Sequence, residues 1–332
     1  MRFVLDKTSK EYELMGGKGV ALAKIGQVID EVPDWFVVSY QGFDIENRCI
    51  LEEAKIQVLE RLNYFENDTY FAVRSSAANE DSNDKSFAGQ FDTFLYVKKE
   101  DVINKIQDVY MSAFSDRIEI YRKENNIKDF MIPSVIIQKM IKSEKSGVAF
   151  GANPITSNVK ETVISAVFGL GTGLVDGDVT SDTYTIFNNK IKKEIGKKDF
   201  YNTLENEKII QKELEDDKKE IQVLSDDEIF MVKELVKKTS DFFGRFQDIE
   251  WAYENGKIYL LQSRPITTLG KTKNKDEKLN IFDNSNIVES YGGITTPLTF
   301  SFIRMVYENV YRELCKIFNV KQEKIEMNSR NV

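Results

Sequence analysis

The chain has 332 residues, of which 41% are hydrophobic and 30% charged, and its formal net charge is −8. This composition indicates a folded globular protein with a sizeable core, and the acidic balance argues against non-specific binding to nucleic acid or anionic membranes. The absence of histidine excludes a Ser-His-Asp triad and a histidine general base, and the two distant cysteines, Cys49 and Cys315, argue against a disulfide framework.

The first candidate site feature is the segment GGKG at residues 16–19, which precedes a predicted helix over residues 20–28. A glycine-rich turn that opens a helix is an anion-binding geometry, because free backbone N–H groups and the helix dipole point outward. The segment is not a Walker A loop, since GxxxxGK[ST] is absent. On these residues alone, a flexible turn with a solvated Lys18 is the alternative. Around it the pattern predicts a strand at residues 3–5, a turn and strand at 32–39 and a helix at 45–62.

Two apolar strands, predicted at residues 71–73 and 93–97, enclose a polar loop with Arg74 at its start and Gly89 near its end. Arg74 carries a rigid fork of donors suited to phosphate or carboxylate, and Gly89 allows close backbone approach because it lacks a Cβ. The pattern indicates an anion site made of backbone N–H groups and one fixed cation. A β-hairpin with Arg74 in a surface ion pair is the alternative. Residues 99–126 are predicted to contain a long amphipathic helix.

The middle of the chain is predicted to consist mainly of strands. They are expected at residues 134–141, 146–154, 162–168 and 184–193, the last a hairpin that turns at Asn188-Asn189. A glycine-rich run, residues 169–174, follows the third strand. The segment 192–222 is dense in charge, which favours a solvated face or a mobile excursion over a binding site. Ser225 and Glu228 form the pattern of a capping box for a helix that ends near Gly244.

A second hairpin is predicted from residues 247–253 and 257–264, which a Glu-Asn-Gly turn joins. In a hairpin of this length Glu250 and Gln262 lie nearly opposite one another. Alternation places Asp248 and Arg264 on the same face. Two oxygen ligands beside an arginine suit Mg²⁺ carrying phosphates, because Mg²⁺ prefers oxygen and takes few protein ligands. An exposed hairpin face with cross-strand salt bridges is the alternative.

Taken in order, these segments resemble a known family. The motifs are GGKG, RSSAANED…SFAGQFDTF, SGVAFGANPIT, FGLGTGLVDGDVTSDTY and DIEW…LLQSRPIT, between about residues 3 and 268. They are similar to the ATP-binding domain of pyruvate-phosphate-dikinase type that opens phosphoenolpyruvate synthases, pyruvate phosphate dikinases and rifampin phosphotransferases. The resemblance implies an α+β, ATP-grasp-like fold, with ATP between two α+β subdomains at about residues 1–125 and 126–268. A charged linker at 269–280 and the start of a mostly helical segment at 281–332 would follow.

The resemblance also implies roles for individual residues. Lys18, Arg74 and Arg264 would meet the phosphates. Glu250 and Gln262 would hold Mg²⁺, with Asp248 nearby as a cofactor-binding residue. The remaining cofactor-binding residues would be a backbone cradle for the phosphates, with Ala88, Gly89, Gln90, Asp92 and Thr93, and a strand edge for adenine, with Gln138, Lys139 and Met140.

Members of this family relay phosphate through a histidine on a separate mobile domain, and the 332 residues contain no histidine. The resemblance therefore implies, besides ATP, a partner domain that carries a phosphohistidine, on the same longer protein or on another chain. We expect a Mg²⁺-dependent ATP-binding phosphotransferase domain of a phosphoenolpyruvate synthase-like enzyme. A non-catalytic nucleotide-binding regulatory module and a rifampin-phosphotransferase-type ATP domain are the alternatives; an ATP-grasp carboxylate ligase fits the RSSA…FAGQ set less well. No signal peptide or membrane span is evident, so we expect a cytoplasmic setting and no nucleic-acid or membrane partner.

Overall fold

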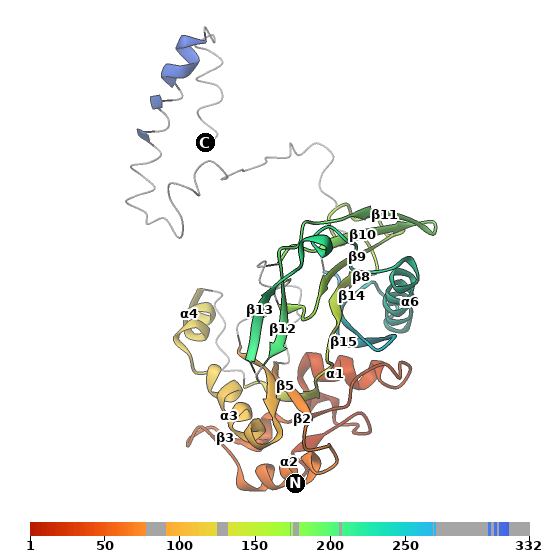
Figure 1. Ribbon diagram of the computed structural model, residues 1–332. Helices are drawn as coiled ribbons and strands as arrows, with labels where there is room; N and C mark the ends of the chain where they lie inside the picture. The colour runs from red at the N-terminus through yellow and green to blue at the C-terminus, as the bar shows by residue number, and fades with distance from the viewer. Residues whose placement is uncertain are drawn as a thin grey trace. The chain divides into compact units, whose positions relative to one another are not determined.

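The computed structural model describes residues 1–77, 91–124, 132–172, 174, 179–205, 208–267, 269, 305–306, 309–310 and 312–318. The chain divides into two compact units, Met1–Lys271 and Thr272–Val332. Within the second unit the described residues are helical up to residue 317. The elements below belong to the first unit (Figure 1). Among the described residues, no helix has the length and apolar character needed to cross a membrane.

The first unit contains a five-stranded antiparallel sheet in the order β1-β2-β7-β5-β6. Its strands are β1 (Val4–Leu5), β2 (Trp35–Val38), β5 (Tyr70–Ser76), β6 (Thr93–Lys98) and β7 (Ser134–Lys139). Alternate residues of the strands face opposite sides, and both sides are covered. Helices α2 (Glu52–Leu62) and α3 (Val102–Ser112) share a core with Phe36 and Phe71, whereas α1 (Gly16–Ile25) packs with Trp35 and Ile136 on the other face.

A six-stranded antiparallel sheet has the order β11-β10-β9-β8-β14-β15. Its strands are β8 (Lys145–Phe150), β9 (Glu161–Phe168), β10 (Asp182–Phe187), β11 (Lys190–Glu194), β14 (Gln247–Glu254) and β15 (Lys257–Pro265). Helix α6 (Asp226–Phe243) packs on one face, where Ile249 and Trp251 join its core (Figure 1). Glu250, between these two residues, therefore faces the opposite side.

Shorter elements complete the described part of the first unit. They are the hairpins β3 (Phe43–Asp44) with β4 (Cys49–Ile50) and β12 (Phe200–Glu205) with β13 (Lys208–Glu213), the helix α4 (Asp116–Glu124), and the 3₁₀ turns η1 (Tyr12–Leu14), η2 (Tyr40–Gly42), η3 (Lys99–Asp101) and η4 (Asp216–Lys218). Ile118 of α4 is buried against Phe91, which follows the undescribed residues 78–90.

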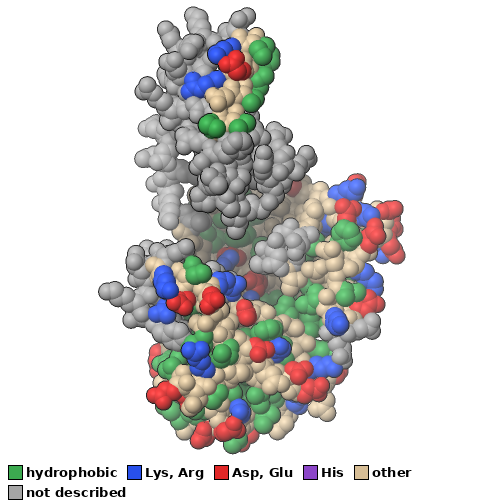
Figure 2. Space-filling model, turned by 90° about the vertical axis from the view of Figure 1, so that its left-hand side faces the viewer, with side chains coloured by type: hydrophobic (Ala, Val, Ile, Leu, Met, Phe, Trp, Pro, Cys, Tyr) green, Lys and Arg blue, Asp and Glu red, His purple; other side chains and the backbone are tan. Residues whose placement is uncertain are grey.

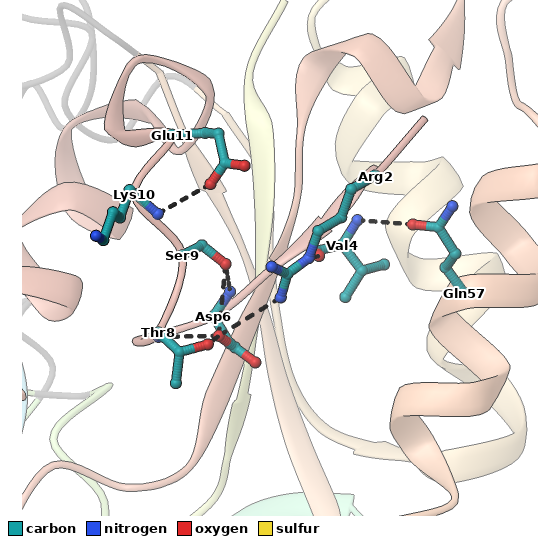
Figure 3. A network of polar contacts seen from close by, with 8 residues as sticks. All are labelled: Arg2, Val4, Asp6, Thr8, Ser9, Lys10, Glu11 and Gln57. Atoms are coloured by element: carbon teal, nitrogen blue, oxygen red, sulfur yellow. Dashed lines mark hydrogen bonds and ion pairs between the residues drawn. The ribbon is translucent and has the colours of Figure 1, made fainter.

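Strand β1 is an edge strand whose backbone donors are covered by a side chain (Figure 3). The Gln57 Oε1 atom of α2 accepts hydrogen bonds from the N–H groups of Phe3 and Val4, at 2.8 and 3.2 Å. The following turn is closed by Asp6, whose Oδ1 accepts from the N–H and hydroxyl of Thr8 at 2.9 and 2.6 Å. Phe3, Val4 and Leu5 are buried, so this edge of the sheet is covered by the protein itself.

The structure confirms the α+β class and several local predictions. The two strands around the loop at Arg74 pair as β5 and β6. Asn188 and Asn189 have positive φ angles of 47° and 60°, as a tight hairpin turn requires. The Ser225–Glu228 capping box is present, and Gly244 ends α6 in the left-handed conformation. Short-range chemistry fixed these features, so the sequence alone could identify them.

Three predictions were wrong in part. Residues 45–51 are not helical, because the Asp44 carboxylate accepts from the N–H groups of Glu46 and Asn47 at 2.9 Å and holds a turn instead. The helix predicted over 99–126 is two helices, α3 and α4, separated after Ser112, whose hydroxyl donates to Val109 O at 2.7 Å. The charged segment after residue 192 contains the hairpin β12–β13 and the buried Lys198, which is 1% exposed.

Candidate functional site

A cavity of about 490 Å³ lies between the two sheets of the first unit. Its walls come from β5, β6 and β7 of one sheet and from β8, β14 and β15 of the other, with Lys18 and residues 170–172 at its sides. Figure 2 shows the hollowed face, where Lys or Arg, acidic and hydrophobic side chains are recessed together. Ten residues with predicted roles line the cavity: Lys18, Arg74, Thr93, Gln138, Lys139, Met140, Asp248, Glu250, Gln262 and Arg264.

The other predicted site residues are not among those lining the cavity. Asp92 is half exposed, and its carboxylate lies 3.7 Å from the guanidinium of Arg117. Ala88, Gly89 and Gln90 lie outside the described residues.

The central contact of the site joins the two sheets. The Nη2 atom of Arg74, on β5, donates to Glu250 Oε2, on β14, at 2.9 Å. Their side chains are only 17% and 31% exposed. Burial, the largest single influence, would raise the pKa of Glu250, but the charge and hydrogen bond of Arg74, followed by the charges of Lys18 and Arg264, outweigh it and lower that pKa. Glu250 is therefore a carboxylate at neutral pH, and several cations face it.

The hairpin β14–β15 has the register expected from sequence. Glu250 pairs with Gln262 and Asp248 with Arg264. The Arg264 Nε atom donates to Asp248 Oδ2 at 2.8 Å, with side chains 46% and 9% exposed. Residues two apart on a strand share a face. The cavity side of the hairpin therefore carries the two carboxylates of Asp248 and Glu250, the Gln262 amide and the Arg264 guanidinium.

Two polar atoms in this cluster lack partners within the described part of the chain. Gln262 Oε1 is buried and accepts no hydrogen bond, although its side chain lines the cavity. The Arg74 Nε atom is also buried and unpaired. A buried polar atom without a partner is destabilising, so its presence beside a cavity points to a ligand. An amide oxygen opposite a carboxylate is a donor set that suits a hard divalent cation such as Mg²⁺.

A β-bulge next to this pair takes part in a contact between the two sheets at the cavity wall. The register of β14 and β15 shifts after Glu250, so that Trp251 pairs with Leu260 and Leu261 is left over. The Gln138 Nε2 atom, on β7, donates to Leu261 O at 3.2 Å. The Gln138 side chain thus braces one sheet against the other, a role that the sequence did not indicate, because the bulge follows from the packing.

The backbone near the predicted adenine edge is partly occupied. The Lys139 N–H donates to Asp34 O at 2.8 Å, and the Met140 N–H donates to Tyr70 O at 2.9 Å. A base bound at this edge would have to use other groups of the strand end, such as carbonyl oxygens.

The glycine-rich GGKG segment has a different role from the one expected of it. It begins α1, but the Gly17 N–H donates to Ala77 O and the Gly19 N–H to Ser76 Oγ, both at 3.0 Å. A Cβ on Gly16, where φ is +70°, would lie 1.8 Å from Ser76 O. The expectation of free N–H groups was therefore wrong at Gly17 and Gly19: the glycines seat the helix against the end of β5, and that packing leaves Lys18 at the cavity.

Sequence reasoning assigned no role to the run that follows β9, although its glycines were visible. Leu170, Gly171 and Thr172 line the cavity, as does Ser146 of β8. The cavity is lined by four Lys or Arg side chains, two carboxylates and an amide oxygen that has no partner among the described residues, a set that suits a ligand with several negative charges and a divalent cation.

The chain is similar to several known proteins. Residues 45–284 match the family described as pyruvate phosphate dikinase, AMP/ATP-binding domain. The probable phosphoenolpyruvate synthase of Methanocaldococcus jannaschii is 36% identical, over 84% of this chain and 28% of that protein. The uncharacterized phosphotransferase YvkC of Bacillus subtilis is 34% identical, over 88% of this chain and 39% of that protein. The rifampicin phosphotransferase of Bacillus cereus is 34% identical, over 80% of this chain and 36% of that protein.

The chain thus spans 28% to 39% of the length of these relatives. Among solved structures, a D-alanine–D-alanine ligase of Bacillus anthracis complexed with ATP aligns with a TM-score of 0.32 and 10% identity, over 75% of this chain and 55% of that one.

Proposed function

Because the chain belongs to the pyruvate phosphate dikinase family through its AMP/ATP-binding domain, we propose that its cavity binds ATP together with Mg²⁺ and donates a phosphoryl group. The acceptor is a histidine outside these 332 residues, which contain none. The ATP-grasp-like site and the phosphate, metal and adenine roles named for individual residues form part of this proposal. The observation that carries it is the partly buried cluster of Arg74, Glu250 and Gln262, whose amide oxygen has no partner among the described residues.

The cations of the cavity support binding of a polyphosphate. Arg74 is fixed on a central strand and offers a planar fork, and Lys18 and Arg264 add positive charge near Glu250. Phosphoryl transfer depends on positioning and charge neutralisation more than on covalent chemistry from the protein. These side chains would orient the phosphates and neutralise charge that develops during transfer.

The carboxylate and amide of the hairpin support the metal part of the proposal. Glu250 and Gln262 would hold Mg²⁺, with Asp248 one pair further along the ribbon. Through these residues the site would supply a divalent positive charge that neutralises part of the phosphate charge. The described residues contain no group of three or more His, Cys, Asp or Glu that could hold a metal. Few protein ligands are expected for Mg²⁺, which binds through one or two carboxylates together with water and substrate phosphates.

The acceptor histidine would lie on a separate domain, of a longer protein or of a second chain. A P–O bond of the polyphosphate breaks as a P–N bond to the imidazole forms, and the leaving nucleotide keeps the electron pair. Relatives named as phosphoenolpyruvate synthase and as rifampicin phosphotransferase match at 36% and 34% identity. Because these two names differ in the final acceptor, we propose for this chain only the step in which a phosphoryl group passes from ATP to the histidine.

Calorimetry with ATP tests the proposal. The folded chain should bind ATP in the presence of Mg²⁺, and removing Mg²⁺ with a chelator should weaken that binding at least tenfold. A folded sample that binds no ATP would overturn the proposal. Labelled ATP mixed with a separately produced histidine-bearing domain of the family then tests transfer. Binding without any labelling of that domain would favour the regulatory module.

A further inference from the structure

The hairpin β12–β13 lies on the glycine-rich run at one end of the cavity. Asn202 forms a backbone bridge with Gly169, and its carbonyl oxygen accepts from the Leu170 N–H at 2.9 Å. The Asn202 side chain reaches further, because its Nδ2 atom donates to Thr172 Oγ1 at 3.0 Å. Leu170 and Thr172 line the cavity, whereas Asn202 does not. Asn202 can therefore act on the cavity through Thr172.

The run is held firmly on both sides. Gly169 has a φ of +66°, and a Cβ there would lie 2.2 Å from Asn202 O, so only glycine fits beneath the hairpin. The Gly169 N–H donates to Glu144 O at 2.8 Å, and Ser146 Oγ donates to Gly169 O at 2.6 Å. Thr172 thus follows a backbone segment fixed by the hairpin above it and by β8 below it.

The hydrogen bond from Asn202 orients the Thr172 hydroxyl. Because Oγ1 accepts from Asn202, the hydroxyl hydrogen must point in another direction, and no acceptor for it occurs among the described residues. Thr172 therefore offers a hydrogen-bond donor at the cavity wall. An uncharged donor of this kind suits a hydroxyl or carbonyl oxygen.

The sheet register shows which part of a ligand would meet this donor. Glu250 pairs with Val148 of β8, whereas Ser146, two residues along, lies beneath Gly171, whose Cβ position is 3.3 Å from Ser146 Oγ. Asp248, with its partner Arg264, lies on the other side of Glu250 along β14. Thr172 is thus at the end of the cavity away from Arg264.

A nucleotide whose phosphates lie on the charged cluster would extend its sugar toward this uncharged end. We infer that Thr172 is a specificity residue that donates a hydrogen bond to a ribose hydroxyl of the bound nucleotide, and that Asn202 is the positioning residue that orients it. The inference rests on the proposed function, since it takes ATP as the ligand. It predicts that the chain distinguishes ribonucleotides from deoxyribonucleotides.

The experiment measures dissociation constants of ATP, 2′-deoxy-ATP and 3′-deoxy-ATP by calorimetry, with Mg²⁺, for the full chain and its variants. Thr172→Val keeps the shape of the side chain and should weaken ATP binding about threefold to tenfold, the value of one neutral hydrogen bond. The loss should vanish for the deoxynucleotide that lacks the contacted hydroxyl, and Thr172→Ser should restore ATP binding.

Asn202→Ala should give the same nucleotide pattern with a smaller loss, because its backbone bonds to the run remain. Gln211→Ala, at the exposed position paired with Asn202 on β13, and Thr203→Val on β12 are matched controls that should bind all three nucleotides like wild type. Equal loss for the three nucleotides in Thr172→Val, or no loss at all, would overturn the inference while wild-type ATP binding still supports the proposed function. Failure of the folded wild type to bind ATP would overturn both.

Discussion

Two charged clusters in the first unit differ in how completely they are satisfied. Asp182 and Lys198 are buried, with side chains 0% and 1% exposed, and form an ion pair of 2.6 Å. Asp182 Oδ1 also accepts from the Gly196 N–H, and Oδ2 accepts from the Tyr184 hydroxyl and the Val223 N–H. At the cavity, by contrast, Gln262 Oε1 and Arg74 Nε are buried without partners among the described residues.

The difference separates structural charges from charges available to a ligand. The Asp182 cluster joins β10 to the segments at residues 196–198 and 223–224, so its polar groups stabilise those connections. The cavity cluster combines charged side chains from both sheets, and two of its polar atoms, Arg74 Nε and Gln262 Oε1, have no partner among the described residues. Mutations in the first cluster should therefore change the free energy of unfolding, and mutations in the second should change ligand binding.

The largest effect is expected at the satisfied pair. Asp182→Ala leaves the Lys198 ammonium buried without its partner and should lower the free energy of unfolding by about 3–5 kcal/mol, measured in urea. Asp182→Asn, which keeps the shape of the side chain, should lower the free energy of unfolding by less than Asp182→Ala does. Lys193→Met is the control, because its ion pair with Asp226 is partly exposed and contributes less than about 1 kcal/mol. Loss of ATP affinity by folded Asp182→Asn, with unchanged stability, would break the comparison.

The next effect concerns the cavity arginine. Arg74→Ala should weaken ATP binding by about one to two decades, because charge-assisted hydrogen bonds contribute roughly 1.5–3 kcal/mol. Arg74→Lys should restore part of it, since an ammonium does not reproduce the planar fork. Adenosine binding should change much less, and Arg2→Ala, at a half-exposed arginine paired with Asp6, should change neither. Equal loss for ATP and adenosine would mean that Arg74 supports the fold, as a simple ion pair would.

An intermediate pair tests the role of burial. Lys145 Nζ lies 2.7 Å from both oxygens of Glu228, which also accepts from the Ser225 N–H. Burial alone would raise the pKa of Glu228, but these hydrogen bonds and the Lys145 charge lower it below the ordinary value of 4.5. A lowered folded-state pKa contributes stability above the unfolded pKa that is lost as pH falls through the folded one.

Glu228→Gln should therefore lower the free energy of unfolding by about 1–2 kcal/mol at neutral pH. The difference from wild type should begin to shrink below pH 4.5, the ordinary value at which Glu228 of the unfolded chain takes up a proton, and should shrink further as pH falls through the lower folded-state pKa. Urea unfolding across pH 3 to 7 measures both. A difference that stays constant over this range would show that the Glu228 charge is not involved.

The smallest effect on stability should have the opposite sign. Gln262→Met removes the unpaired amide oxygen at similar volume, so the free energy of unfolding should stay constant or rise by about 1 kcal/mol. Mg²⁺-dependent ATP binding should weaken in the same variant. A clear loss of stability would show that the Gln262 amide serves the fold, and would place it with the Asp182 cluster.

The sequence predicted the local parts of the site better than the long-range ones. Strand alternation was enough to bring Glu250 opposite Gln262. The Arg74–Glu250 contact spans 176 residues of chain, and only the packing of two sheets creates it. The bulge at Leu261 and the brace from Gln138 follow from the same packing. The GGKG segment was expected to offer free N–H groups to an anion. Instead, the N–H groups of Gly17 and Gly19 donate to Ala77 and Ser76 of the protein itself.

The most direct test of the cavity cluster is the dependence of ATP affinity on Mg²⁺ concentration, in wild type and in Glu250→Gln. The substitution keeps the size of the side chain and leaves the α6 face of β14 untouched, so Glu250→Gln should still fold and unfold cooperatively in urea, although loss of the ion pair with Arg74 lowers its stability somewhat. Wild-type affinity for ATP should rise with Mg²⁺, whereas that of Glu250→Gln should stay low and nearly independent of Mg²⁺. The same Mg²⁺ dependence in both proteins would contradict the assignment of Glu250 to a metal and phosphate site.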